Sequence, residues 1–296
     1  MTATAPAPIR IGRRRFDWGA RTYVMGILNV TPDSFSGDGL LAGGGSADER
    51  VERAVRAART MAEAGADIVD VGGESTRPGH RPVEAGEEAD RVLPIVAAIR
   101  AAIPNLPISI DTTKPSVAEA ALAAGADLVN DVWGVAQDDS LARIAAARRA
   151  PIVLMHNRAE PRYDDLVAEV IADLAEAVER TVLAGVERDL ILIDPGFGFG
   201  KTPLHNLEVL RNLSALRVLG RPILLGTSRK STLGKVLDLP ADERLEATLS
   251  TTALGIAAGV DIVRVHDVRQ NVRVARMTDA VVRGWQPDDP PEGGSA

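Results

Sequence analysis

Several residues that could do chemistry follow directly after short apolar runs of the sequence. The clearest is Asp194, which follows the run Ile-Leu-Ile at residues 191–193 and precedes the stretch Pro-Gly-Phe-Gly-Phe-Gly-Lys at residues 195–201. A buried parallel strand has this pattern when its carboxyl end opens onto a ligand. The glycines at positions 196, 198 and 200 would let the backbone approach a flat ligand closely. We therefore predict a binding site beside Asp194.

The same pattern recurs along the chain. The predicted strands end at, or just before, polar and charged residues, which include Asn29, Arg77, Asp111, Asn130, His156, Asp194, Lys230, Arg264 and His266. A single polar residue at such a place usually caps the following helix. A whole series of strands that end in amides, acids or cations is harder to explain by capping alone. We interpret these residues as the rim of one binding site.

The rim residues fall into two groups by the ligands that they suit. One group can pair donor for acceptor with a flat heterocycle bearing amino, ring N–H and carbonyl groups, and it consists of Asp111, Asn130, Asp194 and Lys230. The other suits phosphate oxygens and a hard Mg²⁺ ion, and it consists of Asn29, Arg77, Arg264 and His266. Asn29 alone would hold Mg²⁺ weakly, so most ligands to the ion would be diphosphate oxygens and water.

The elements that must position these residues alternate between two types. Short Val, Ile and Leu runs predict strands at residues 23–29, 68–71, 108–111, 128–130, 152–156, 190–194, 223–226 and 262–266. Alanine-rich amphipathic stretches predict helices at residues 47–64, 85–102, 116–124, 139–148, 166–184, 204–219, 243–258 and 271–283. This alternation favours an α/β fold, a single-domain (β/α)₈ TIM barrel rather than an open sheet. Active sites of such barrels lie at the carboxyl ends of the strands.

Smaller features complete the predicted organisation. Gly-x-Asp sequences follow predicted helices at residues 65–67, 125–127 and 259–261, and glycine after a helix is a left-handed cap. Residues 9–19, with Gly12 near their middle, could form a hairpin that plugs the barrel floor. Residues 30–46 and 72–83 are long connections, which are commonly lids or binding loops. We expect disordered tails at residues 1–8 and 286–296, so the barrel domain covers residues 9–285.

The composition excludes several classes of function. The net charge of −7 argues against a nucleic-acid or anionic-membrane surface. The chain has no cysteine, which excludes disulfides, a thiolate nucleophile and a cysteine metal site. No apolar run is long enough to span a bilayer, and the first residues lack the pattern of a signal peptide. We therefore expect a cytoplasmic protein with small-molecule substrates and with neither nucleic-acid nor membrane partners.

Seven short motifs resemble those of the dihydropteroate synthase family, in the family's order. They are NVTPDSFS at residues 29–36, GGESTRPG at 72–79, DTTK at 111–114, ND at 130–131, DPGFGFGK at 194–201, SRKS at 228–231 and RVHD at 264–267. The resemblance covers nearly everything between residues 21 and 285. One motif departs from the family form, because residues 35–39 read FSGDG in place of FSDGG. This departure concerns the geometry of that loop rather than its chemistry.

The resemblance implies an enzyme, a transferase that condenses 7,8-dihydropterin-6-ylmethyl diphosphate with 4-aminobenzoate. The implied products are 7,8-dihydropteroate, a folate precursor, and pyrophosphate. Loss of the diphosphate would leave a pterin-methyl cation, which the arylamine would capture. The implied cofactor is Mg²⁺, and sulfonamides are implied inhibitors. A homodimer through the last helices is the implied assembly.

The resemblance also assigns roles to residues of this chain. Those implied for the pterin diphosphate are Thr76, Asp111, Asn130, Met155, Asp194, Gly226, Lys230, Arg264, Val265 and His266. Those implied for 4-aminobenzoate are Phe35, Arg77, Pro78, Phe199 and Ser231. The implied catalytic residues are Asp111, Lys230, Arg264 and His266, with Asn29 as the protein ligand to Mg²⁺. In this scheme Asp111 stabilises the cation, whereas Arg264 and His266 hold the diphosphate.

Three other functions fit part of the pattern. The pterin-binding domain of a corrinoid methyltransferase would share the barrel and the Asp/Asn edge, but it would not need the cations Arg77, Lys230, Arg264 and His266. A Schiff-base aldolase would use Lys201 or Lys230 covalently, and borohydride trapping with a carbonyl substrate would detect it. A non-catalytic paralogue would bind pterin without turnover, which a steady-state assay would reveal.

Overall fold

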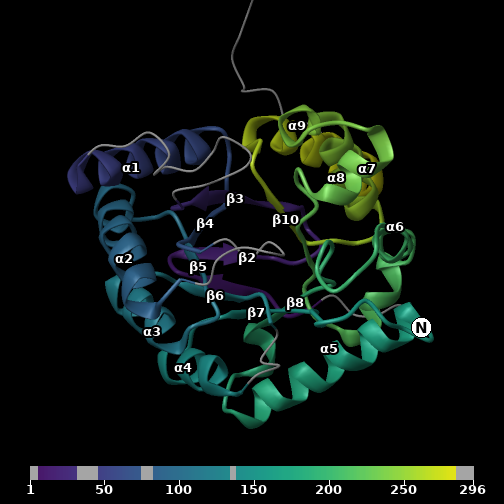
Figure 1. The fold of residues 1–296 in the computed structure, drawn as a ribbon, viewed down its shortest axis with the longest axis horizontal. Coiled ribbons are helices and arrows are strands. Elements are labelled where there is room, and N and C mark those ends of the chain that lie inside the picture. Colours follow the sequence, from purple (N-terminus) through teal and green to yellow (C-terminus); the bar gives the residue numbers. More distant parts are fainter. Residues whose placement is uncertain (1–5, 32–45, 75–82, 134–137, 285–296) are drawn as a thin grey trace, which may run out of the picture.

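Parallel strands form a closed barrel with helices around it (Figure 1). The structure, a computed structural model, describes residues 6–31, 46–74, 83–133 and 138–284. The barrel strands are β3 (Tyr23–Asn29), β4 (Ile68–Gly72), β5 (Ile108–Asp111), β6 (Leu128–Asp131), β7 (Ile152–Met155), β8 (Ile191–Asp194), β9 (Leu224–Leu225) and β10 (Ile262–Val265). Their order in the sheet is β8-β7-β6-β5-β4-β3-β10-β9, and all of these pairings are parallel. A parallel bridge between Ile193 and Ile223 closes the ring.

The helices pack on the outside of this barrel. They are α1 (Ala47–Glu63), α2 (Ala85–Ala102), α3 (Pro115–Ala124), α4 (Ser140–Arg148), α5 (Leu166–Leu183), α6 (Pro203–Arg211), α7 (Ser231–Leu237), α8 (Leu245–Ala257) and α9 (Val268–Asp279). The predicted TIM barrel is confirmed, with two departures. The helix predicted at residues 204–219 ends at Arg211, and 3₁₀ turns at Leu213–Leu219 replace its second half. Helix α7 was not predicted, because its 7 residues are too few to show a period.

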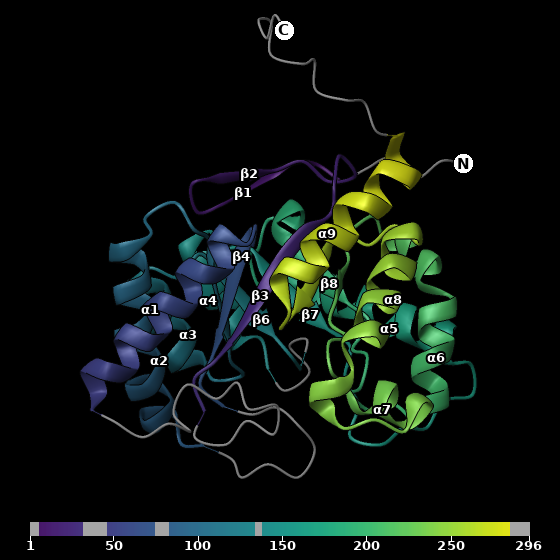
Figure 2. The same ribbon diagram turned by 90° about the horizontal axis from the view of Figure 1, so that it is seen from above.

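A hairpin closes the amino end of the barrel, as the sequence predicted. Strands β1 (Ile9–Ile11) and β2 (Arg14–Phe16) pair antiparallel, and Gly12 turns between them with a φ of 57°. Ile11 and Phe16 are buried among the inward-facing side chains at the base of the barrel. Figure 2 shows the hairpin across one end of the barrel and α7 near the opposite end. The hairpin therefore leaves the carboxyl ends of the strands for a binding site.

The Gly-x-Asp sequences mark a repeated contact at the amino ends of the strands. The carboxylates of Asp67, Asp127 and Asp261 each accept a hydrogen bond from a backbone N–H of the neighbouring strand or, for Asp261, of the residue that precedes β9. The distances are 2.9, 2.9 and 3.0 Å. The N–H of each aspartate donates to the carbonyl of that same neighbouring residue, which is Val24, Ile108 or Ile223 respectively. These paired bonds fix the register of adjacent strands at the base of the barrel, so the recurring junction has a structural role.

Some expectations fall on residues that the structure does not describe. The tails at residues 1–8 and 286–296 and the two long connections lie largely outside the described residues. The domain boundaries therefore stay predictions. Among the helices of the described ranges, none combines the length and apolar character that crossing a lipid bilayer requires.

Candidate active site

The side chains above the apolar base of the barrel come from alternate positions of its strands. Residues two apart on a strand point to the same side of the sheet. On six strands, the residue two places beyond a buried residue of the base is Asp70, Asn130, Met155, Asp194, Gly226 or Arg264. Asp111 follows the buried Ser109 in the same way, and His266 follows Arg264. Folding therefore brings most of the predicted rim into one ring of inward-facing residues.

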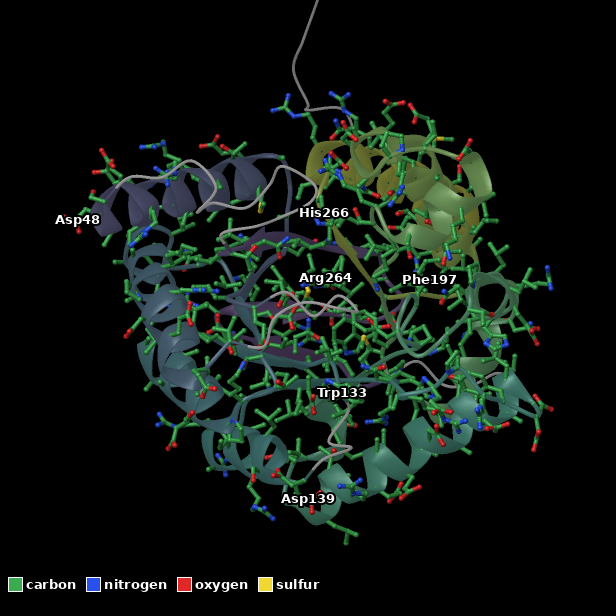
Figure 3. The ribbon with its side chains drawn as sticks, in the orientation of Figure 1. Asp48, Trp133, Asp139, Phe197, Arg264 and His266 are labelled. Atoms are coloured by element: carbon green, nitrogen blue, oxygen red, sulfur yellow. The ribbon has the colours of Figure 1, made fainter. Side chains whose placement is uncertain are left out.

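Arg264 joins two buried carboxylates in this ring, and Figure 3 places it near the middle of the barrel. Its Nε donates to Asp70 Oδ2 at 2.6 Å, and its Nη2 donates to Asp111 Oδ2 at 2.7 Å. Asn130 Nδ2 also donates to Asp70 Oδ2, at 3.2 Å. The Asp70 side chain is 0% exposed and that of Asp111 is 7% exposed. These four side chains form a connected polar network inside the barrel.

Burial and charge act in opposite directions on this network. Burial opposes the charged form of Arg264, but the carboxylates of Asp70 and Asp111 outweigh it and raise the pKa of the guanidinium. Burial raises the pKa of Asp111 to about 7, and Arg264 limits that rise while Asp70 adds to it. The Oδ1 atoms of Asp70 and Asp111 are buried without a hydrogen-bond partner among the described residues. Because unpaired buried acceptors are costly, the ring suits a ligand that donates hydrogen bonds.

Asp194 ends β8 and is held by the turn that follows it. The N–H of Gly196 donates to Asp194 Oδ1 at 2.7 Å. Burial raises the pKa of Asp194, and Lys230 opposes this rise. Gly196, Gly198 and Gly200 have φ values of 69°, 85° and 54°, in the left-handed region that favours glycine. The glycine-rich stretch thus turns back over the strand end and orients the carboxylate.

Lys230 reaches this turn from the start of α7. Its Nζ donates to the carbonyl of Phe197 and lies 4.5 Å from the centroid of the Phe199 ring. A Cβ added at Gly226 would lie 3.8 Å from Lys230 Nζ and 3.7 Å from Arg264 Cβ. Lys230 and Arg264 therefore both approach β9 at Gly226.

His266 continues the inward face of β10 beyond Arg264, and Ser228 fixes it. Ser228 Oγ and His266 Nδ1 are 2.9 Å apart, and the His266 backbone N–H donates to Ser228 Oγ at 3.1 Å. The carboxylate of Asp267 pairs with Arg229, whose Nη2 lies 2.7 Å from its Oδ1. Asp267 is therefore engaged by Arg229, while Arg264 is engaged by the ring carboxylates.

Asn29 ends β3 beside Gly72, and Gly72 pairs in turn with Asp111 of β5. Its position at the carboxyl end of the barrel agrees with the predicted rim. The described residues contain no cluster of three or more His, Cys, Asp or Glu side chains that could hold a metal ion. A single amide oxygen suits Mg²⁺ only where ligand oxygens and water complete the coordination shell. Asn29 is compatible with that arrangement.

The remaining predicted site residues have different surroundings. Met155 ends β7 and is buried on the inward face. Val265 packs in the core between the sheet and the helices, so its side chain points away from the ring. Ser231 is exposed at the start of α7. Four predicted residues lie outside the described part of the chain, namely Phe35, Thr76, Arg77 and Pro78.

The pattern of polar residues at strand ends did not indicate Asp70, because this residue lies within β4 and not at its end. The period of two within a strand could have found it, since Ile68 and Asp70 must face the same side. A carboxylate inside an apolar strand needs a buried partner. Its partner Arg264 is 194 positions away along the chain, and the sequence pattern contains no signal for that distance.

The chain is similar to known proteins over nearly its whole length. The sequence profile of a family described as pterin binding enzyme matches residues 25–266. The dihydropteroate synthase of Clostridium beijerinckii is 49% identical over 276 residues, which cover 93% of this chain and 100% of that protein. A solved dihydropteroate synthase from Clostridium difficile in the presence of pteroic acid is 49% identical with a TM-score of 0.85, covering 90% of this chain and 99% of the other. One from Xanthomonas albilineans with 4-aminobenzoic acid is 40% identical with a TM-score of 0.86, covering 94% and 98%.

Proposed function

This chain belongs to the dihydropteroate synthase family of pterin binding enzymes, and we propose that it condenses 7,8-dihydropterin-6-ylmethyl diphosphate with 4-aminobenzoate. The products are 7,8-dihydropteroate and pyrophosphate. The C–O bond between the pterin methylene and the diphosphate breaks, a C–N bond to the arylamine forms, and the amine loses one proton. The observation that carries this proposal is the buried network in which Arg264 joins Asp70 and Asp111.

The pterin ring binds to the polar side chains inside the barrel. Asp194 and Asn130 face its pyrimidine edge, which carries amino and ring N–H donors, and Lys230 reaches its carbonyl. The burial of Asp194 supports this role, because a charged acceptor in a site with little water bonds strongly to N–H donors. The buried oxygens of Asp70 and Asp111 that lack partners among the described residues offer two further acceptors.

The diphosphate lies toward the open end of the barrel, where Arg264 and His266 neutralise the charge that develops as it leaves. Arg264 has five N–H donors, and its bonds to Asp70 and Asp111 use two of them. Asn29 would offer its amide oxygen to Mg²⁺, and diphosphate oxygens and water would complete the coordination shell. When bound, Mg²⁺ supplies further charge neutralisation on the diphosphate.

Asp111 stabilises the cation that remains on the pterin methylene. Its carboxylate is buried in the ring, where little water competes for the charge. An arylamine is already nucleophilic, so the reaction does not require a strong general base. Loss of one such preorganised charge contact is expected to slow turnover about 10²-fold.

We assign the 4-aminobenzoate site to Phe199 and Ser231, together with Phe35, Arg77 and Pro78 of the two long connections. The Phe199 ring already contacts the Lys230 ammonium, which links this site to the pterin site. We expect 4-aminobenzoate to bind well only after the diphosphate or its product occupies the barrel. Sulfonamides, as analogues of 4-aminobenzoate, are expected to compete for this site.

One assay tests the proposed reaction. Pyrophosphate release should require both the pterin diphosphate and 4-aminobenzoate, and omission of either substrate should abolish it. Tight pterin binding without any turnover would instead identify a non-catalytic paralogue. Trapping of a carbonyl substrate on Lys201 or Lys230 by borohydride would favour the aldolase alternative.

We also propose a homodimer that forms through the last helices. Large apolar side chains are exposed there, with Leu254 of α8 62% exposed and Met277 of α9 66% exposed. Sedimentation equilibrium should give twice the chain mass, and Leu254→Glu together with Met277→Glu should shift it toward the monomer. A monomeric wild-type protein would contradict the proposal. The cytoplasmic location expected from the sequence stays a prediction.

A further inference from the structure

Lys201 follows the glycine-rich turn in the sequence, and its ammonium contacts three acceptors. Its Nζ is 2.7 Å from His156 Nδ1 and 3.2 Å from each of the carbonyl oxygens of Gly196 and Phe199. The two carbonyls lie at opposite ends of the turn, which the bond from Phe199 N–H to Gly196 O at 3.0 Å closes. One side chain therefore holds both ends of the turn together.

His156 is held in turn by α5. Its Nε2 lies 3.0 Å from Asp173 Oδ2, and its side chain is 1% exposed. The carboxylate of Asp173 can only accept, so His156 Nε2–H donates to Asp173 and Nδ1 accepts from Lys201. Burial lowers the pKa of His156 to about 4, and the charge of Lys201 adds to this fall. His156 is therefore neutral at physiological pH, as an acceptor must be.

The glycine-rich turn links this pair to the proposed pterin site. Gly196 N–H orients Asp194, while the Phe197 carbonyl and the Phe199 ring contact Lys230. The turn is pressed closely against the residue after β7, because a Cβ at Gly196 would come within 1.8 Å of the His156 carbonyl oxygen. A displacement of the turn at Phe197 and Phe199 would therefore move both of these contacts of Lys230.

We propose that Lys201, supported by His156, is a positioning residue that holds the turn at residues 196–200 so that Lys230 faces the pterin. This inference rests on the proposed function, since it concerns the same pterin site. Lys201 itself does not touch the substrate in this arrangement. Its contribution passes through the Phe197 carbonyl and the Phe199 ring to Lys230.

The charge state of Lys201 does not decide this role. Burial lowers the pKa of Lys201 to about 7, and the charged groups that act on it come from β8, α5, the start of α7 and the residues after β7, namely Asp194, Asp173, Lys230 and Arg158. The neutral amine has two N–H donors, which suffice for the two carbonyls, and the ammonium has a third for His156 Nδ1. The contact with the turn therefore persists on either side of neutral pH.

A double-mutant cycle tests whether Lys201 acts through Lys230. The variants are Lys201→Met, Lys230→Met and the double substitution, and the readout is the Kd of 6-hydroxymethylpterin by calorimetry. Lys201→Met should weaken binding about tenfold in the wild-type background but less than about twofold in the Lys230→Met background. Lys235→Met is the matched control, because Lys235 is exposed on α7, and it should leave the Kd unchanged.

Equal losses in both backgrounds would mean that Lys201 only stabilises the fold, and no loss in either would remove its role altogether. If Lys201→Met does not fold, His156 gives the same test. His156→Leu removes the acceptor and should weaken binding about tenfold, whereas His156→Asn keeps an acceptor and should recover most of the affinity. Equal affinities for these two variants would also overturn the inference. If the wild-type protein binds no pterin, the proposed function fails instead.

Discussion

Replacing Asp70 with asparagine removes one of the two carboxylates that share the Arg264 guanidinium. The asparagine side chain would keep the size of the original and could still accept one hydrogen bond from Arg264 Nε. The substitution has two effects that both lower the pKa of Asp111. The like charge that raises the pKa of Asp111 disappears, and Asp111 becomes the only carboxylate that balances the charge of Arg264 in this pair. We therefore expect Asp70→Asn to lower the pKa of Asp111.

The size of this shift follows from the charges involved. Two unit charges about 5 Å apart interact by about 3 kcal/mol at an effective dielectric constant of about 20, and about 1.4 kcal/mol corresponds to one pKa unit. The guanidinium between the two carboxylates already offsets part of their repulsion. We expect a fall of about one unit from the value near 7 that Asp111 has in the native protein.

The assay is the pH dependence of kcat/KM for the pterin diphosphate, measured by pyrophosphate release. This ratio reports the ionisation of the free enzyme. Asp111 must be a carboxylate to stabilise the cation, so the wild-type ratio should fall as the pH decreases below about 7. In Asp70→Asn the fall should begin about one pH unit lower, whatever the change in the maximal rate.

Asp127→Asn is the control for this experiment. Asp127 also pairs with an arginine, Arg100, but it lies at the amino end of the strands, away from the ring. Its substitution should lower the free energy of unfolding without changing the pH at which kcat/KM begins to fall. If kcat/KM of Asp70→Asn begins to fall at the same pH as in the wild type, or at a higher pH, the fall does not report an Asp111 whose pKa is raised by Asp70.

Three further predictions follow from single contacts. Asp194→Ala should weaken pterin binding about 100-fold by calorimetry, because it removes a buried charged acceptor, and an unchanged affinity would rule out the pyrimidine-edge role. Gly196→Ala should lower the free energy of unfolding by more than about 3 kcal/mol in denaturant titration, since its Cβ would clash with the His156 carbonyl at a φ of 69°. Phe16→Ala should cost about 3–5 kcal/mol of stability yet leave the pterin Kd unchanged in the folded fraction, because Phe16 is buried at the opposite end of the barrel, and a changed Kd would contradict this separation.

The sequence predicted which end of the barrel carries the polar rim and which end is the apolar base, because all strands of a parallel barrel point the same way. Strands such as β8 bury both faces, so they read as continuous apolar runs, and the first polar residue marks the end that faces a ligand. Asp111, Asn130 and Asp194 were found in this way. The hairpin at the base was also predictable, since a glycine between short alternating segments indicates a turn.

The sequence by itself determined the alternation of strands and helices, the end of the barrel that carries the site and the residue types available there, because these depend on local patterns of a few residues. Tertiary structure alone decided the partners. Within β4, Asp70 is a carboxylate in an apolar strand without a local partner. Closure of the barrel brings Arg264, 194 positions away in the sequence, into hydrogen-bond contact with it. In the sequence, Lys201 is only the last residue of a motif. In the structure, His156, which follows β7, lies 2.7 Å from its ammonium. Such pairings depend on how separate strands meet around the barrel, and no local pattern encodes that meeting.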